Sequence, residues 1–183
     1  MPIPRFTTED TVLLVIDMQD RLLPAIHDHE ATTAQVVKLI DGCNALDIPV
    51  LVTEQYRKGL GETVPQVSDH FPDDVIIEEK LKFSVYTKAV REHLATLGRK
   101  RVIICGIETH VCVLQSALDL AQAGYITGVT TDAVSSRRPT DRDTALTRME
   151  QAGVIPLTVE MVLLELVFEA GTDEFKSILP IIK

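Results

Sequence analysis

The stretch RVIICGIETHVCVLQSALDL, residues 101 to 120, decides the fold. Its first part, residues 101 to 105, predicts a buried strand, because a short run of β-branched apolar residues ends at a glycine. After a turn through residues 106 to 108, apolar residues recur at intervals of three and four, which predicts a helix with Thr109 as its N-cap. Cys112 then lies in the first helical turn, where unpaired N–H groups and the helix dipole favour a thiolate. A cysteine in this position is a candidate nucleophile.

The alternation of strand and helix extends over the whole chain. The run TVLLVID, residues 11 to 17, predicts a strand buried on both faces that ends at Asp17. Further strands are predicted at residues 49–53, 75–79, 125–131 and 154–157, and helices at residues 30–46, 87–97 and 140–151, with two more helices on either side of Gly171. Such an order indicates parallel strands joined by right-handed crossovers. We expect one domain over residues 1–183, a three-layer α/β/α, Rossmann-like fold with a mostly parallel six-stranded sheet.

One connection is unusually long. Residues 54 to 73, EQYRKGLGETVPQVSDHFPD, contain two glycines and two prolines and show no clear periodicity. A loop of this length in a compact domain is usually a lid or an interface. Plain surface is the alternative interpretation.

Charge and hydropathy exclude several classes of partner. The chain has 27 acidic and 18 basic residues, a formal charge of −9, and its lysines and arginines are scattered. Nucleic acids and acidic membrane surfaces reward a clustered basic patch, so neither is expected as a partner. No apolar run could span a bilayer, and the N-terminus MPIPRFTTED has no signal-peptide core. We expect a cytoplasmic protein.

The three cysteines indicate neither disulfides nor a metal site. Cys43, Cys105 and Cys112 show no CxxC spacing and are odd in number. Cys43 lies on the apolar side of a predicted helix and Cys105 at the end of a predicted strand, so both are expected in the core. The chain also lacks the glycine-rich phosphate loops GxGxxG and GxxxxGK[ST]. No cofactor is expected.

Three chemically useful residues follow predicted strands. Asp17 follows the first, Lys82 the third, and Cys112 the fourth. Ligands of open α/β sheets bind beyond the carboxyl ends of the strands, so these side chains could meet there. Asp17 could take the thiol proton, Lys82 could stabilise the anion, and the thiolate could attack a carbonyl, imine or nitrile carbon. The alternative for the aspartate and the lysine is a solvated charge at a strand end.

Longer segments around these residues resemble a known family. They are LLVIDMQDRL at Asp17, EKLKFSVY at Lys82, ICGIETHVCVLQSALDL at Cys112 and TDAVSSR at Asp132. In this order they resemble the isochorismatase-like cysteine hydrolases, which include nicotinamidases, N-carbamoylsarcosine amidases and isochorismatases. The resemblance covers nearly the whole chain and is strongest to the isochorismatase domain-containing proteins.

The resemblance implies roles for particular residues. Asp17, Lys82 and Cys112 would form a catalytic triad, with Asp17 as base and Cys112 as nucleophile. The family's cis peptide maps to Ile107–Glu108, and the N–H groups of Glu108 and Cys112 would form the oxyanion hole. Gln19 and Asp132 match motif positions with supporting roles.

Two departures from the family limit the substrate. Metal-dependent nicotinamidases carry an Asp-x-His pattern after the second strand, where this chain has Thr53-Glu54-Gln55-Tyr56. A bound zinc or iron is therefore not expected, and nicotinamide is doubtful as the substrate. Isochorismatases proper cleave a vinyl ether without a cysteine nucleophile, so Cys112 argues against that reaction. The residues expected to line the substrate pocket are Gln19, Glu54, Gln55, Tyr56 and Phe83.

The leading hypothesis is a cysteine hydrolase of a small amide or related C–N bond that forms a thioester on Cys112. One alternative is a binding module that retains the fold without hydrolysis. Another is vinyl ether hydrolysis with Asp17 as the acid. The expected partner is a small-molecule substrate, and the apolar C-terminal region and the family resemblance favour a homo-oligomer, a dimer or larger.

Overall fold

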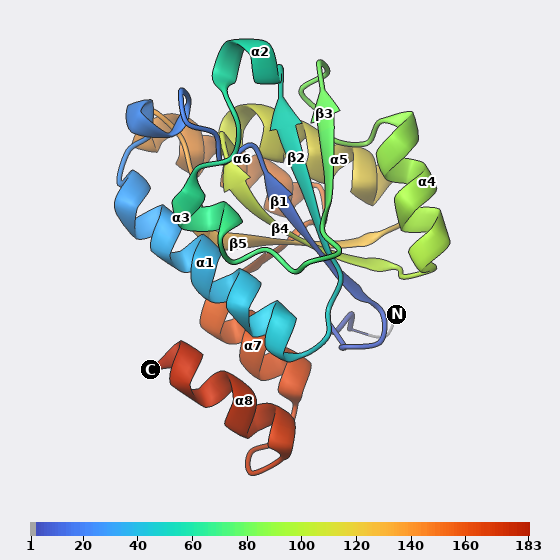
Figure 1. Cartoon of the computed structure of the whole chain (residues 1–183). Helices are drawn as coiled ribbons and strands as arrows, with labels where there is room; N and C mark the ends of the chain where they lie inside the picture. The colour runs from blue at the N-terminus through green and yellow to red at the C-terminus, as the bar shows by residue number, and fades with distance from the viewer. Residues whose placement is uncertain (1–2) are drawn as a thin grey trace.

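A computed structural model describes residues 3–183 and places a single sheet at the centre of the molecule (Figure 1). The sheet has six parallel strands in the order β3-β2-β1-β4-β5-β6. The strands are β1 Thr11–Ile16, β2 Val50–Gln55, β3 Ile76–Lys80, β4 Arg101–Ile107, β5 Ile126–Ser135 and β6 Ile155–Leu157. The expected fold is confirmed, and the sheet is parallel throughout.

Helices cover both faces of this sheet. Those described are α1 His29–Ala45, α2 Arg57–Leu60, α3 Pro65–Ser68, α4 Lys88–Leu97, α5 Leu114–Gln122, α6 Pro139–Gln151, α7 Val159–Val167 and α8 Asp173–Ile182, with a 3₁₀ turn η1 Leu23–Ala25 and a π-helical turn η2 Thr109–Val113. Helices α1 and α7 pack on one face, with α8 against these two helices, and α4, α5 and α6 pack on the other face (Figure 1). None of the helices within residues 3–183 is long and apolar enough to cross a membrane.

The two faces of the sheet explain its apolar strands. All six residues of β1 are buried, and alternate residues belong to different cores, Leu13 and Val15 to one and Val12 and Leu14 to the other. A strand covered on both faces needs apolar side chains at every position, which is why the run is uninterrupted. Cys43 and Cys105 are fully buried in the core beside α1, as expected.

The two central strands approach closely where β4 reaches Gly106. This residue pairs with Ile16 of β1 and has a φ of 110°. A Cβ atom built there would lie 2.1 Å from the Ile16 carbonyl oxygen. Only glycine satisfies both the backbone angle and the contact, so Gly106 fixes the distance between the ends of β1 and β4.

Several predicted boundaries were wrong, mainly near strand ends. The expected loop 54–73 begins inside β2, holds α2 and α3, and is anchored by a bridge between Gln19 and Thr63. Strand β5 continues four residues beyond the predicted residue 131, and its Ser135 pairs with Ile107. Both corrections lengthen the sheet at the edge where the candidate site lies.

Candidate active site

Three buried polar side chains meet at the carboxyl edge of the sheet. The Lys80 Nζ atom lies 2.7 Å from Asp17 Oδ2 and 3.5 Å from Cys112 Sγ. The exposed fraction of the side chain is 1% for Lys80 and 0% for Asp17, and Cys112 is 5% exposed. A charged pair this deeply buried is unusual, and here it is placed against a thiol.

Asp17 is held by the neighbouring strand. Its N–H donates to the Thr53 carbonyl at 3.0 Å, and the Thr53 hydroxyl donates to Asp17 Oδ1 at 2.9 Å. The Asp17 backbone is left-handed, with a φ of 54°, a conformation that is uncommon for residues other than glycine and that recurs at functional sites. With Lys80 on Oδ2, both oxygens of the carboxylate are therefore engaged.

The predicted position of Lys82 in this group was wrong. Lys80 is the last residue of β3 and pairs with Gln55 of β2, so its side chain reaches Asp17. Lys82 lies two residues beyond the strand in an exposed bend. The third strand was predicted to end at Glu79, but it includes one more residue, Lys80. The lysine of the site was therefore expected beyond the strand, at Lys82, and not at the last residue of the strand.

Two glutamines hold the lysine end of the site. Gln55 Oε1 accepts from Lys80 Nζ at 2.7 Å, so Gln55, one of the predicted pocket residues, contacts the candidate site. Gln19 is fully buried, and its side chain joins the Gln55 backbone N–H and carbonyl to the Gly61 carbonyl. Gln19 thus clamps the loop after β2, which fits the supporting role implied by its motif.

The turn before Cys112 differs from the predicted helix start. The Ile107–Glu108 peptide bond is cis, as the family resemblance implied. Thr109 does not cap a helix: its hydroxyl is buried and has no hydrogen-bond partner among the described residues, and Cys112 is the fourth residue of the π-helical turn η2. Ser116 links this turn to the segment after β3, because its hydroxyl donates to the Cys112 carbonyl and accepts from the Val85 N–H at 3.0 Å.

The electrostatics favour a neutral thiol at rest. Burial raises the pKa of Cys112 to about 12, the nearby Asp17 also raises it, and Lys80 acts in the opposite direction. The upward direction is opposite to the one expected for a cysteine at a helix start. Burial also raises the pKa of Asp17, against the lowering effect of Lys80, which makes this carboxylate a better proton acceptor than an exposed one.

The other predicted pocket residues have different environments. Glu54 is buried, and its carboxylate accepts from the Thr63 N–H and hydroxyl and pairs with Arg57. Glu54 therefore stabilises the segment between β2 and β3. Tyr56 and Phe83 are 47% and 52% exposed, and their place in a substrate pocket stays a prediction. Asp132 accepts from the backbone N–H of Val159, the first residue of α7, whose N-cap is Thr158.

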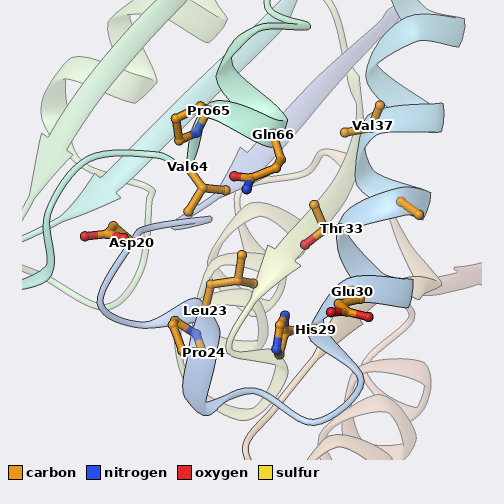
Figure 2. A pocket seen from close by; sticks show the side chains of 11 residues that line it. Asp20, Leu23, Pro24, His29, Glu30, Thr33, Val37, Val64, Pro65 and Gln66 are labelled. Carbon is orange, nitrogen blue, oxygen red and sulfur yellow. The ribbon is translucent and has the colours of Figure 1, made fainter.

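A cavity of about 680 Å³ opens beside this region, between η1, α1 and α3 (Figure 2). Asp20, Leu23, His29, Val37 and Val64 are among its lining residues, and Asp17, Lys80 and Cys112 are not. The group of Asp17, Lys80 and Cys112 is therefore separate from this cavity. Within residues 3–183, no group of three or more His, Cys, Asp or Glu side chains is arranged to hold a metal ion.

Comparison with known proteins shows the family of this chain. Residues 11–161 match the model of the isochorismatase domain. The chain belongs to the isochorismatase domain family. Isochorismatase domain-containing protein 2 of Danio rerio is 40% identical over 96% of this chain and 88% of its own length. The secreted isochorismatase effector Isc1 of Phytophthora sojae is 41% identical over 98% and 87%.

Solved structures of this family superimpose over almost the whole chain. A structure described as MAR1 ribonuclease from Caenorhabditis elegans has a TM-score of 0.94 and 38% identity, covering 98% of this chain and 92% of its own. YcaC from Pseudomonas aeruginosa, solved with hexane-2,5-diol and covalent acrylamide, has a TM-score of 0.91 and 26% identity over 99% and 93%. The YcaC product of Escherichia coli, described as an octameric hydrolase of unknown specificity, has a TM-score of 0.88 and 27% identity over 98% and 93%. The family therefore supports a hydrolase fold for this chain.

Proposed function

We propose that this protein hydrolyses a small amide or a related C–N bond through a thioester on Cys112. The observation that carries the proposal is the position of Lys80 Nζ, 2.7 Å from Asp17 and 3.5 Å from the Cys112 sulfur, in a buried site. Nucleophile, base and counter-charge are then within reach of one another, the arrangement that covalent catalysis requires.

The chemistry follows from the raised pKa values. Because burial raises the pKa of the Cys112 thiol, its proton passes to Asp17 as the sulfur attacks the amide carbon. Lys80 stabilises the developing thiolate, and the N–H groups of Glu108 and Cys112 would hold the oxyanion. Asp17 then gives the proton to the leaving amine, and the C–N bond breaks to leave the thioester. Water, deprotonated by Asp17, releases the acid and restores the thiol.

One comparison supports a reactive nucleophile in this fold. The Pseudomonas structure contains covalent acrylamide, so that relative reacts with a small unsaturated amide. We extend the idea to Cys112 here. An acrylamide adduct located by mass spectrometry on Cys112, and absent from the Cys112→Ala variant, would agree with a nucleophile that small amides can reach.

The decisive experiment is a panel of small amides assayed for ammonia release. We expect Cys112→Ala to lower turnover by about 10⁴-fold or more, as removal of a nucleophile does. Turnover that survives this substitution would exclude the covalent mechanism. Vinyl ether chemistry with Asp17 as the acid would instead appear as cleavage of a vinyl ether substrate by wild type and Cys112→Ala alike. Binding of small amides without turnover, by wild type and variant alike, would instead favour the binding module.

We further propose that the protein acts on its small-molecule substrate as a cytoplasmic homo-oligomer. Met161 and Leu164 of α7 are exposed, as is Phe168 just after the helix, and the Escherichia coli relative is described as octameric. Light scattering of the purified chain measures the mass directly. A monomer at micromolar concentration would contradict this part of the proposal.

A further inference from the structure

The carboxylate of Glu108 is buried in the turn that precedes Cys112. Its side chain is 8% exposed, and the residue directly follows the buried carboxyl end of β4. A buried carboxylate is costly unless hydrogen-bond donors compensate for the lost water. The partner of Glu108 therefore matters to the shape of this turn.

That partner is Arg137, 29 residues further along the chain. Glu108 Oε2 accepts from the Arg137 backbone N–H at 3.1 Å and from Arg137 Nε at 3.0 Å. The Arg137 side chain itself is 58% exposed, so the pair buries the acid rather than the base. The extension of β5 to Ser135, opposite Ile107, is what brings Arg137 to this position.

The backbone of Glu108 is held as firmly as its side chain. Its carbonyl accepts from the N–H groups of Val111 at 3.1 Å and Val113 at 3.2 Å. Its own N–H donates to no other residue within 3–183. An N–H without a protein acceptor, on a residue anchored at both the carbonyl and the carboxylate, is what a preorganised oxyanion site needs.

We propose that Arg137 is a positioning residue, which holds the Glu108 carboxylate so that the Glu108 N–H faces the oxyanion formed during attack by Cys112. This inference rests on the proposed covalent function. Arg137→Met removes the Nε donor and leaves the carboxylate with the backbone N–H alone. The turn can then rotate to solvate the carboxylate, and the N–H loses its alignment.

Two reactions of Cys112 separate this role from a general structural one. In acylation by p-nitrophenyl acetate, the sulfur–carbon bond forms through a tetrahedral oxyanion, Asp17 takes the thiol proton, and p-nitrophenolate leaves. In alkylation by iodoacetamide, sulfur displaces iodide and no oxyanion forms. We expect Arg137→Met to slow acylation about tenfold, because complete loss of one oxyanion donor costs about 10²–10³-fold and here the donor is only misaligned. Alkylation should stay within about twofold of wild type, the scatter allowed for a surface substitution.

Matched variants complete the design. Arg138→Met makes the same charge change at the adjacent exposed residue and should alter neither reaction. Arg137→Lys, which keeps the charge but not the planar donor, should recover part of the acylation rate. Melting temperatures of all variants verify that each is folded.

Three results would overturn the inference. One is acylation of Arg137→Met at the wild-type rate, and another is an equal loss in both reactions. The third is a loss seen only as a higher KM for amides that carry a carboxylate, which would make Arg137 a substrate-binding residue. If wild-type Cys112 is alkylated but never acylated, the proposed function fails and this inference fails with it.

Discussion

Among single residues, Lys80 stabilises the site in a way that depends on pH. Lys80→Met leaves the Asp17 carboxylate buried without a counter-charge and raises its pKa further. We expect the free energy of unfolding to fall by about 3–5 kcal/mol at pH 8. The folded variant binds more protons than the unfolded chain above the unfolded pKa, so the loss grows as pH rises and should be smaller at pH 5.

Chemical denaturation at the two pH values tests this prediction. Lys82→Met is the control, since Lys82 is exposed and should change stability by less than about 0.5 kcal/mol. A larger effect at Lys82 than at Lys80 would contradict the assignment of the buried lysine.

Asp17 sets the expected pH dependence of activity. The base must be ionised to accept the thiol proton, so kcat/KM should fall as pH drops through its folded-state pKa, which burial raises above the usual 3.8. Thr53→Val removes the hydroxyl that donates to Asp17 Oδ1 and should move this acidic limb to higher pH. An unchanged limb in Thr53→Val would mean that another group controls it.

The candidate site could be predicted only in part from the sequence. Asp17 directly follows β1 and Cys112 lies in the turn after β4, each within a distinctive motif, and the structure brings both to the carboxyl edge of the sheet. Lys80 and Lys82 are two residues apart, so on an extended chain their side chains point to the same face and alternation does not distinguish them. Only the position at which β3 ends distinguishes them. The salt bridge between Glu108 and Arg137 is equally hidden, because it depends on how far β5 extends.

Within the elements, the contact between β4 and β1 should dominate stability near the site. Gly106→Ala places a Cβ 2.1 Å from the Ile16 carbonyl oxygen at a φ of 110°. We expect more than about 4 kcal/mol of destabilisation or failure to fold. Gly98→Ala is the matched control, with a φ of 67° and open space, and should cost only about 1 kcal/mol.

Urea unfolding of both variants measures the difference. Equal losses at Gly106 and Gly98 would show that the backbone angle alone matters, and not the closeness of the two strands.

The strands and long helices themselves could be predicted, since their apolar periodicity is strong. The two short helices between β2 and β3 could not, because four-residue helices carry too few side chains to show a period.

For the whole molecule, the net charge of −9 bears on whether RNA could be a substrate. A related structure at 38% identity is called a ribonuclease. Excess negative charge repels the phosphate backbone, so we expect this protein not to cleave RNA. Incubation with labelled single-stranded RNA tests this, with Cys112→Ala as the control for contaminating nucleases. Cleavage lost in that variant would contradict the prediction.

Because Lys80 pairs with Gln55, the register between β2 and β3 determines where the Lys80 ammonium group lies. Side chains alternate along a strand, so one residue inserted within Ile76–Lys80 would carry the ammonium group to the opposite face and away from the sulfur. The same insertion in the connection before β3 would leave the register intact. Length variation among natural relatives should therefore be common before β3 and rare within it, even though β3 is an edge strand with little buried surface.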